Sequence, residues 1–245
     1  MSLDLSVVVP VHNEIGNVGP LLSEIRVALD GRAEYEILCV DDGSDDGTGE
    51  RLAALRPAFP RLRVMRLARR TGQSAAIVAG VEEARGAWIA TLDGDGQDDP
   101  ADLSQMLSMV GDSAAAQKLR LVVGQRLRRH DTLLKRISSR IANAVRARLL
   151  GDATPDTGCG LKLFSREAFM ALPRFDHMHR FLPALFLQAG WQVASAPVTN
   201  RPRLHGRSHY GVLDRLGTGI VDLLGVLWLK RRALGPVTAE TIDEH

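Results

Sequence analysis

A dense group of acidic residues follows an apolar run in the first half of this 245-residue chain. Residues 87–90 predict a buried strand, and residues 91–100 continue as Thr-Leu-Asp-Gly-Asp-Gly-Gln-Asp-Asp-Pro. Carboxylates as crowded as those of Asp93 and Asp95 repel one another, which raises their pKa values. A hard divalent cation relieves this repulsion, and substrate phosphates often complete its ligand shell. The segment therefore indicates a Mg²⁺ or Mn²⁺ site that holds a diphosphate at a strand end.

A second acidic pair lies in the Val-Asp-Asp-Gly-Ser stretch at residues 40–44. A double aspartate at a strand end can accept hydrogen bonds from a nucleobase and from ribose hydroxyls. Helix capping is the alternative, because Ser44, Asp45 or Asp46 can serve as the N-cap of the helix that follows. We expect both uses: capping by the later residues, and ligand contact by Asp41 and Asp42.

Alternating strands and helices must position these side chains. Strands are expected at residues 5–11, 36–40, 63–67, 88–92 and 121–124, and helices at residues 17–29, 46–55 and 74–84. This alternation predicts an α/β fold with a mostly parallel central sheet and helices on both faces. Ligands bind such sheets at the carboxyl ends of the strands. Polar clusters at residues 12–14, 41–44 and 93–95 follow three of those ends.

The composition is that of a globular protein, with 45% hydrophobic and 24% charged residues and a formal net charge of +2. The length allows one α/β domain with a full core. Cys39 lies inside an apolar run far from Cys159, so we expect a buried thiol and no disulfide framework. The amino terminus has no basic leader, and no apolar segment reaches the roughly 18 residues of a confident membrane span. The expected location is therefore the cytoplasm.

Two amphipathic segments stand out in the second half of the chain. The first, at residues 126–149, has eight Lys or Arg residues against a single acid, Asp131. Such a helix either packs on the core with a solvated basic face or contacts an anionic membrane surface. The second is expected at residues 212–229 and ends in Lys-Arg-Arg. We therefore divide the chain into a domain at 1–211, an amphipathic segment at 212–235 that is a candidate for membrane contact, and a tail at 236–245.

Four motifs occur in order at fitting spacing. They are Val-Pro-Val-His-Asn-Glu at 9–14, Val-Asp-Asp-Gly-Ser at 40–44, Leu-Asp-Gly-Asp-Gly-Gln-Asp at 92–98, and Asp-Thr-Gly-Cys-Gly-Leu-Lys-Leu-Phe at 156–164. Together they resemble the family 2 glycosyltransferases of GT-A fold, the nucleotide-diphospho-sugar transferase fold. More closely, they resemble the branch of dolichol-phosphate mannosyltransferases and bacterial polyprenyl-phosphate glycosyltransferases. Residues 203–211 extend the match, which covers about residues 5–211.

The resemblance implies a donor site for a nucleotide sugar, with GDP or UDP as the nucleotide. Its nucleotide pocket and pyrophosphate loop would include Pro10, Asn13, Glu14, Asp41, Asp42, Arg69 and Gln73. Asp93, Asp95 and Gln97 would surround Mg²⁺ or Mn²⁺ at the diphosphate. The metal would neutralise charge on the departing nucleoside diphosphate.

The resemblance also implies a lipid phosphate acceptor held by basic residues. The candidates are Lys162, Arg180, Arg203 and Arg207, with Arg203 foremost because it opens the Arg-x-x-Gly-x-Ser pattern. Members of the branch commonly have Lys at the position of His209, and a histidine there carries only part of a lysine's charge at pH 7. A phosphate acceptor arrives as an anion, whereas a sugar hydroxyl needs a general base. Asp98 or Asp156 would be that base.

The resulting expectation is a metal-dependent inverting glycosyltransferase that moves a hexose from a nucleotide sugar to a polyprenyl phosphate, with Asp95, Asp98 and Arg203 at the catalytic centre. It would be peripheral on the cytoplasmic face of a membrane, since the chain has no counterpart of the transmembrane helices of many bacterial members. Transfer to a saccharide or lipid-glycan hydroxyl is the alternative, and a non-catalytic nucleotide-sugar binding module is the second alternative. No nucleic-acid partner is expected, and His177 and His179 lack the spacing of a zinc site.

Overall fold

The computed structural model describes residues 4–110, 118–126, 146–152, 154–202 and 212–232, with the side chains of the last segment described from residue 219 onward. The strands are β1 (Leu5–Val11), β2 (Tyr35–Asp41), β3 (Leu62–Arg66), β4 (Trp88–Thr91), β5 (Leu119–Arg126), β6 (Lys162–Ser165) and β7 (Gln192–Val198). The helices are α1 (Val18–Leu29), α2 (Thr48–Leu55), α3 (Gln73–Glu83), α4 (Leu103–Met109), α6 (Arg166–Met170), α7 (Leu182–Gln188) and α8 (Val212–Arg232). Short 3₁₀ turns are η1 (Arg56–Ala58), η2 (Pro100–Asp102) and η3 (Met178–Arg180).

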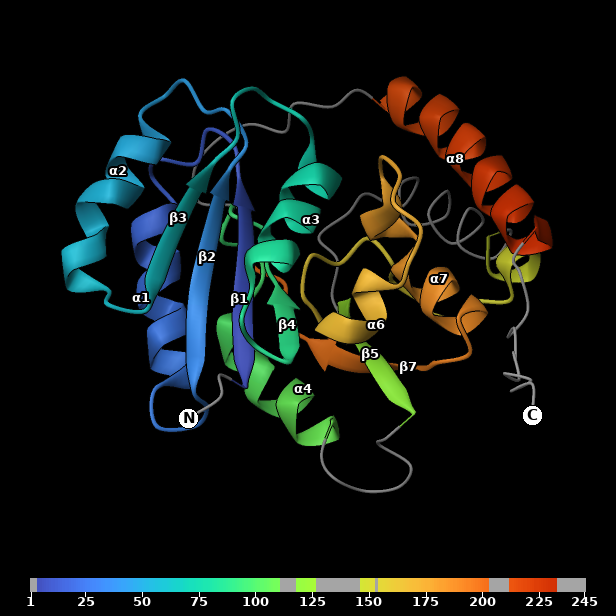
Figure 1. Ribbon diagram of the computed structural model, residues 1–245, viewed down its shortest axis with the longest axis horizontal. Coiled ribbons are helices and arrows are strands. Elements are labelled where there is room, and N and C mark those ends of the chain that lie inside the picture. Colours follow the sequence, from blue (N-terminus) through green and yellow to red (C-terminus); the bar gives the residue numbers. More distant parts are fainter. Residues whose placement is uncertain (1–3, 111–117, 127–145, 153, 203–211, 233–245) are drawn as a thin grey trace, which may run out of the picture.

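The strands form one sheet in the order β3-β2-β1-β4-β6-β5-β7 (Figure 1). Neighbouring strands from β3 to β4 are parallel, and so are β5 and β7. Among the described strands only β6 is reversed, because it pairs antiparallel with both β4 and β5. The mostly parallel sheet predicted from the sequence is therefore confirmed. It brings the carboxyl ends of β1 to β4 to one edge.

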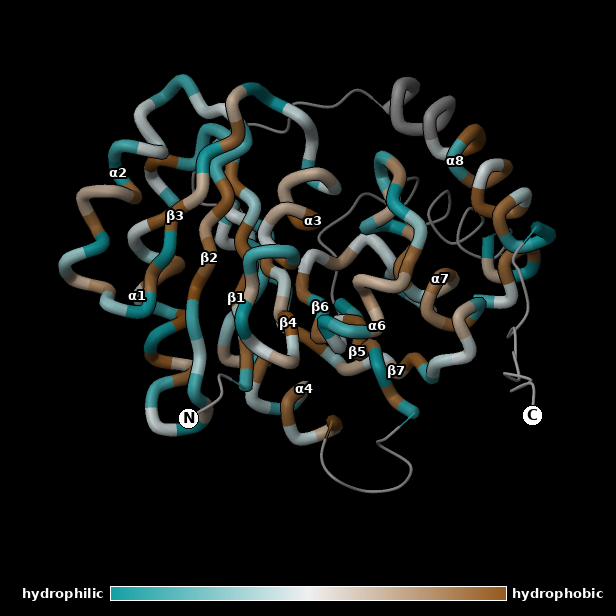
Figure 2. Tube along the Cα trace, in the orientation of Figure 1, coloured by the Kyte–Doolittle hydropathy of each residue, from teal (hydrophilic) through white to brown (hydrophobic). Residues whose placement is uncertain are grey.

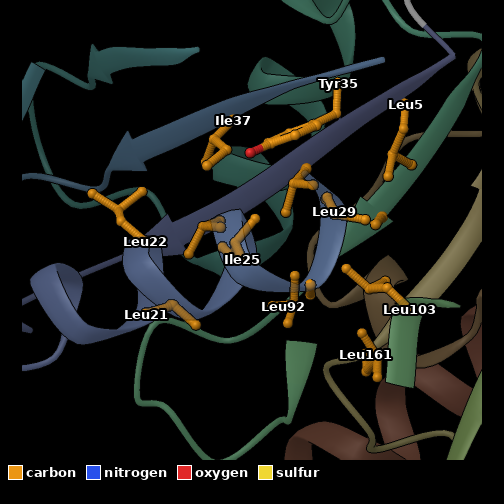
Figure 3. Packing of buried hydrophobic residues seen from close by; sticks show 14 of the residues in the cluster. Leu5, Leu21, Leu22, Ile25, Leu29, Tyr35, Ile37, Leu92, Leu103 and Leu161 are labelled. Atoms are coloured by element: carbon orange, nitrogen blue, oxygen red, sulfur yellow. The ribbon is translucent and has the colours of Figure 1, made fainter. Parts of the chain in front are cut away.

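Helices cover both faces of the sheet, and each face has its own hydrophobic core. On one face, Leu22, Ile25 and Leu29 of α1 form one cluster with Leu5 of β1 and Ile37 of β2 (Figure 3). On the other face, α3 and α7 pack over a second cluster that includes Val8. Hydrophobic residues are frequent along the central strands (Figure 2), and those of β1 and β2 divide between the two cores, as expected for a parallel sheet covered on both faces.

Close packing of α3 on the sheet depends on Gly80. A Cβ atom at this position would lie 2.5 Å from Cγ1 of Val8 and 3.1 Å from Cγ2 of Val40. The absence of a side chain thus lets the helix approach β1 and β2 directly. This fixes the position of α3, whose first residue is at the ligand edge of the sheet.

The five strands expected in the first half occur as β1 to β5, and the three expected helices occur as α1, α2 and α3. We did not expect β6 and β7 as strands. β6 has only four residues, and β7 is an edge strand that contains Pro197 and lacks a clean alternation of buried and exposed residues. The amphipathic segment expected at 212–229 is α8. The division of the chain into domains stays a prediction, and the tail at 236–245 lies outside the described residues.

Most of the basic segment at 126–149 lies outside the described residues, but Arg146 is in a short helical stretch at 146–150. Its side chain is buried, donates to the carbonyl of Thr154 (2.9 Å) and lies 3.6 Å from a carboxylate oxygen of Asp152. Arg146 also donates to the hydroxyl of Thr157. This arginine therefore stabilises the chain that leads into the fourth motif, and its side chain does not contribute to an exposed basic surface.

In the part of the chain that the structure describes, we find no helix that combines the length and the apolar character needed to cross a bilayer.

Candidate active site

Backbone and side-chain hydrogen bonds join the loops that follow β1 and β2. The backbone N–H of Asn13 donates to the hydroxyl of Ser44 (3.0 Å). The side chain of Asn13 donates to Asp45 (2.7 Å) and accepts from its backbone N–H (3.0 Å). The backbone N–H of Glu14 donates to the hydroxyl of Thr48 (2.9 Å). Asn13 and Glu14 thus lie at the predicted edge of the sheet, where hydrogen bonds within the protein fix the conformation of both loops.

The prediction that Ser44, Asp45 or Asp46 is the N-cap of α2 is wrong, but the start of the helix is contacted by Asp46. Its Oδ1 accepts a hydrogen bond from the backbone N–H of Thr48, the first residue of α2 (2.9 Å). The N-cap position itself is Gly47, which has a φ of 91°. Asp46 therefore stabilises the start of α2 from one residue before the cap.

Asp41 and Asp42 are both buried, with exposed fractions of 0% and 4%. Asp41 accepts from the backbone N–H of Ser44 (2.9 Å), and its second oxygen lies 3.5 Å from Nε of Arg66. Asp42 accepts from the loop that follows β3, through the N–H of Thr71 (2.6 Å) and the N–H of Gly72 (2.8 Å). Both carboxylates thus stabilise strand-end loops, and their contact with base and ribose stays a prediction.

The acids of the third motif gather after β4 and are joined by a direct hydrogen bond to α3. Nε2 of Gln73 donates to Oδ1 of Asp93 (2.7 Å). The backbone N–H of Asp93 donates to Oδ2 of Asp98 (3.3 Å), and that of Gln97 donates to Oδ1 of Asp95 (3.1 Å). The structure therefore brings together the residues expected at the metal, with Gln73 beside them.

The crowding predicted for these carboxylates is present. Burial, followed by the charge of Asp95, raises the pKa of Asp93. Burial, followed by the charge of Asp93, raises the pKa of Asp98 to about 7. Each of these two carboxylates is thus harder to ionise because of burial and a charged neighbour. A bound cation would relieve this repulsion.

One buried cation, Lys162, and one partly buried cation, Arg126, lie beside the acids. Lys162, the first residue of β6, is 4% exposed, donates to the carbonyl of Cys159 and interacts electrostatically with Asp93 and Asp98. Burial lowers the pKa of Lys162. Burial alone would also lower the pKa of Arg126, but its hydrogen bonds to Asp156 outweigh this effect and raise it. Both cations interact electrostatically with acids of the cluster and so balance part of its negative charge.

Gly160 lets the fourth motif approach the acids. A Cβ atom there would lie 2.4 Å from Cγ of Asp93 and 2.5 Å from Oδ2 of Asp98. The carbonyl of Gly160 accepts a hydrogen bond from the hydroxyl of Thr91 (2.8 Å) at the end of β4. The fourth motif therefore forms one wall of the acid cluster.

Arg201 is a further residue at this edge that the sequence analysis did not single out. Its backbone N–H donates to the carbonyl of Gln97 (2.9 Å). Its guanidinium pairs with Asp99 (2.5 Å) and with Glu24 of α1 (2.7 Å). Arg201 thus joins the segment after β7 to the third motif, at residues 92–98, and to Asp99 beside it. Arg126 was also missed as a site residue, although its position at the end of β5 is a strand-end signal.

The remaining predicted residues are more scattered. Pro10 is near the end of β1, and a Cβ atom on Gly94 would lie 3.1 Å from its carbonyl oxygen. Arg69 is exposed in the loop after β3, and Arg180 is partly buried in η3. The described residues provide neither arginine's side chain with a hydrogen bond or ion pair. Arg203, Arg207 and His209 lie outside the described residues.

The donor set fits a divalent cation that depends on its substrate for part of its ligand shell. Among the described residues, no group of three or more His, Cys, Asp or Glu side chains is arranged to hold a metal ion by itself. Two carboxylates, Asp93 and Asp95, and the amide of Gln97 are close together on one loop. Mg²⁺ typically uses one or two carboxylates together with substrate phosphates. Asp93, Asp95 and Gln97 are therefore suited to hold a metal–diphosphate pair.

The fold has a solved counterpart. The chain is similar to the mannosyltransferase PcManGT from Pyrobaculum calidifontis, whose structure is in complex with GDP-Man and Mn²⁺. The TM-score is 0.71 at 20% sequence identity, over 96% of this chain and 66% of that one. The sheet and its helices therefore have the GT-A fold of glycosyltransferases.

Sequence comparison defines the family. Residues 6–172 match the family model described as glycosyl transferase family 2, and the chain belongs to that family. It is 38% identical over 243 residues to the dodecaprenyl-phosphate galacturonate synthase of Rhizobium johnstonii, covering 96% of this chain and 70% of that protein. It is 34% identical over 212 residues to the undecaprenyl-phosphate 4-deoxy-4-formamido-L-arabinose transferase of Edwardsiella ictaluri, covering 85% and 63%. The chain thus spans less than two thirds of the second relative. Both relatives fall in the polyprenyl-phosphate branch that the motifs resemble.

Proposed function

We propose that this protein transfers a sugar from a nucleotide sugar to a polyprenyl phosphate. The observation that supports this most directly is the cluster of Asp93, Asp95 and Gln97 at the carboxyl edge of the sheet, in a chain whose relatives are named for polyprenyl-phosphate products. In the reaction, an oxygen of the lipid phosphate bonds to the anomeric carbon as the bond to the nucleoside diphosphate breaks. Attack in line with the leaving group inverts the configuration at that carbon.

The protein's own residues orient the donor. Asp93, Asp95 and Gln97 would hold Mg²⁺ or Mn²⁺, which would supply Lewis-acid neutralisation of the charge on the departing diphosphate. Gln73 fixes the orientation of the Asp93 carboxylate through its 2.7 Å hydrogen bond. Because Lys162 is buried against the acids, we assign it the role of an internal counter-charge in place of the acceptor-phosphate role that the motif suggested.

The other basic candidates, Arg180, Arg203 and Arg207, bind the acceptor phosphate in this proposal. Arg180 is the described member of this group whose charge is not used by another described side chain. Arg203 and Arg207 complete the proposal from sequence alone. An anionic phosphate needs no general base, and two observations disfavour the alternative of a hydroxyl acceptor. Asp98 is only 4% exposed, and Asp156 is bound through both oxygens by Arg126.

The sugar is the least constrained part of the proposal. The motifs alone suggested a hexose. The relative that aligns over 96% of this chain is named for galacturonate, which is a hexuronic acid. We therefore favour a galacturonate donor, and propose 4-deoxy-4-formamido-arabinose and a neutral hexose such as mannose as the competing donors.

Contact with a membrane surface at the cytoplasmic face is part of the proposal, because the acceptor is a lipid. α8 lies on the far side of the molecule from β3 (Figure 1). Val226 is buried against the core, whereas four large apolar side chains of α8 are 54–68% exposed: Ile220, Val221, Leu224 and Trp228. Figure 2 shows hydrophobic stretches along α8, and the last turn of the helix is basic, with Lys230, Arg231 and Arg232. An apolar face with adjacent basic residues suits binding in the plane of an anionic membrane.

The test is transfer of radiolabelled sugar to purified polyprenyl phosphate with Mn²⁺ present. UDP-galacturonate, UDP-4-deoxy-4-formamido-arabinose and GDP-mannose would be compared as donors. We expect a lipid-linked product with one of them and none with the Asp95→Ala variant, whose melting temperature without ligands should match that of the wild type. Product on a glycan acceptor only, or full activity of Asp95→Ala, contradicts the proposal.

A further inference from the structure

Asp42 uses its whole carboxylate on the loop that follows β3. Oδ1 accepts from the backbone N–H of Thr71 (2.6 Å) and from its hydroxyl (2.8 Å). Oδ2 accepts from the backbone N–H of Gly72 (2.8 Å). Charge-assisted hydrogen bonds of this kind are about twice as strong as neutral ones. Asp42 therefore holds residues 71 and 72 in one position.

Gly43 allows this loop to lie directly on the end of β2. Its φ is 66°, a conformation that favours glycine. A Cβ atom at this position would lie 2.6 Å from the backbone nitrogen of Arg70 and 2.8 Å from the carbonyl carbon of Arg69. Backbone contact and the Asp42 carboxylate thus fix the same short loop from two sides.

The loop leads directly into Gln73, which is the hydrogen-bond partner of Asp93 in the third motif. Gly72 is the N-cap of α3, and Gln73 is the first residue of that helix. Nε2 of Gln73 donates to Oδ1 of Asp93 (2.7 Å). A continuous series of contacts therefore runs from the acid pair after β2, through the start of α3, to the acid cluster after β4.

We propose that Asp42 is a positioning residue for the metal site, which acts through Thr71, Gly72 and Gln73 to orient the carboxylate of Asp93. This inference rests on the proposed function, since it assumes that Asp93 holds the metal. It differs from the expected role of Asp42, which was direct contact with the base or ribose. Partners that orient a metal ligand typically change metal affinity about 10–100-fold when they are removed.

The test measures the dissociation constant for Mn²⁺ in the presence of saturating UDP, because the metal takes part of its ligand shell from substrate phosphates. Free Mn²⁺ is quantified by electron paramagnetic resonance, with a sample of UDP alone as the reference. The variants are Gln73→Leu, Asp42→Asn and the double variant. We expect each single variant to weaken Mn²⁺ binding about 10–100-fold. The Mn²⁺ affinity of the double variant should be no lower than that of the more weakly binding single variant, because both changes break the same series of contacts. Gln105→Leu, an exposed glutamine on α4, is the matched control and should bind Mn²⁺ as the wild type does.

Two further measurements separate the possible outcomes. UDP affinity in the presence of a chelator reports direct nucleotide contact, and the melting temperature without ligands reports folding. Unchanged Mn²⁺ affinity in Asp42→Asn, with weaker UDP binding or only a lower melting temperature, overturns the positioning role. If Asp42→Asn does not fold, Gln73→Leu decides the question, and wild-type Mn²⁺ affinity in that variant also overturns it. Absence of Mn²⁺ binding by the wild type in the presence of UDP contradicts the metal site of the proposed function itself and removes the basis for this inference.

Discussion

Arg126 grips both carboxylate oxygens of Asp156 at the end of β5. Nε of Arg126 lies 2.7 Å from Oδ2, and Nη2 lies 2.9 Å from Oδ1. Asp156 is 3% exposed, so the pair is largely shielded from solvent on the acid's side. The pair joins β5 to the fourth motif, residues 156–164, whose Gly160 packs against Asp93 and Asp98. One ion pair thus connects the framework of the sheet to a wall of the acid cluster.

We expect Arg126→Lys to destabilise the protein and to reduce transfer, because an ammonium group cannot form the two parallel hydrogen bonds of a guanidinium. Loss of a hydrogen bond to a charged group typically lowers the free energy of unfolding by about 1.5–3 kcal/mol. Urea unfolding measures this change. Arg61→Lys is the control, since the pair of Arg61 with Asp30 is exposed and its loss should cost less than about 1 kcal/mol. Equal losses in the two variants would contradict the prediction.

Gly160→Ala should abolish most of the transfer activity. The new Cβ atom would displace the carboxylates of Asp93 and Asp98, which it would approach within 2.4 and 2.5 Å. Overpacking of this kind typically costs about 1–3 kcal/mol of stability. Gly19→Ala on α1 is the matched control, because its Cβ atom would meet neighbours only at 3.8 Å and beyond. Comparison of turnover and melting temperature in both variants checks the prediction, which fails if Gly160→Ala retains wild-type turnover.

The partly buried imidazole of His179 in η3 should make stability depend on pH. Burial, followed by the charge of Lys162, lowers its pKa well below 6.5, and its ring nitrogen lies 2.7 Å from the hydroxyl of Ser74. The unfolded chain binds a proton below about pH 6.5 whereas the folded protein does not. The contribution of His179 to the free energy of unfolding is therefore complete above pH 6.5. It is lost as the pH falls below 6.5, by up to about 1.4 kcal/mol per pH unit. Urea unfolding between pH 7.5 and 5.5 should show a shallower pH dependence in His179→Gln, and an unchanged slope argues against the assignment.

The exposed face of α8 should bind anionic liposomes. Replacement of Leu224 and Trp228 by Ser removes two side chains that are each 61% exposed, so co-sedimentation should fall. Added salt should weaken the binding of the wild type, because it screens the basic end of the helix. Val27→Ser, which changes an apolar residue that is 75% exposed on α1, is the control and should bind as the wild type does. Equal binding of all three proteins would show that α8 is not the contact surface.

Local patterns were sufficient to predict the first half of the fold. Strands β1, β2 and β4 are almost fully buried apolar runs, and each is followed by polar residues at a chain reversal. That signal depends only on neighbouring residues. β6 was harder to predict because it has four residues and because its reversed direction follows from pairing with β4 and β5, which are distant in the sequence.

The site divides in the same way. Asp93 and Asp95 were predicted from spacing, and the structure places them at the expected edge. The motif assigned Lys162 to an acceptor phosphate. A sequence cannot indicate that this lysine is buried beside Asp93 and Asp98. The bonds of Arg201 to Gln97 and Asp99 also depend on a long-range contact, the short antiparallel bridge between Asp98 and Asn200.

The reversed strand β6 places a constraint on insertions and deletions. Lys162 pairs with Thr91 on β4 and with Val123 on β5, which fixes its side chain on one face of the sheet. A shift of one residue along β6 would turn every side chain of the strand to the opposite face. The ammonium group would leave the acid cluster, and Leu161 or Leu163 would take its place. The spacing between Gly160 and Lys162 should thus tolerate neither insertion nor deletion, although both residues lie outside the metal motif.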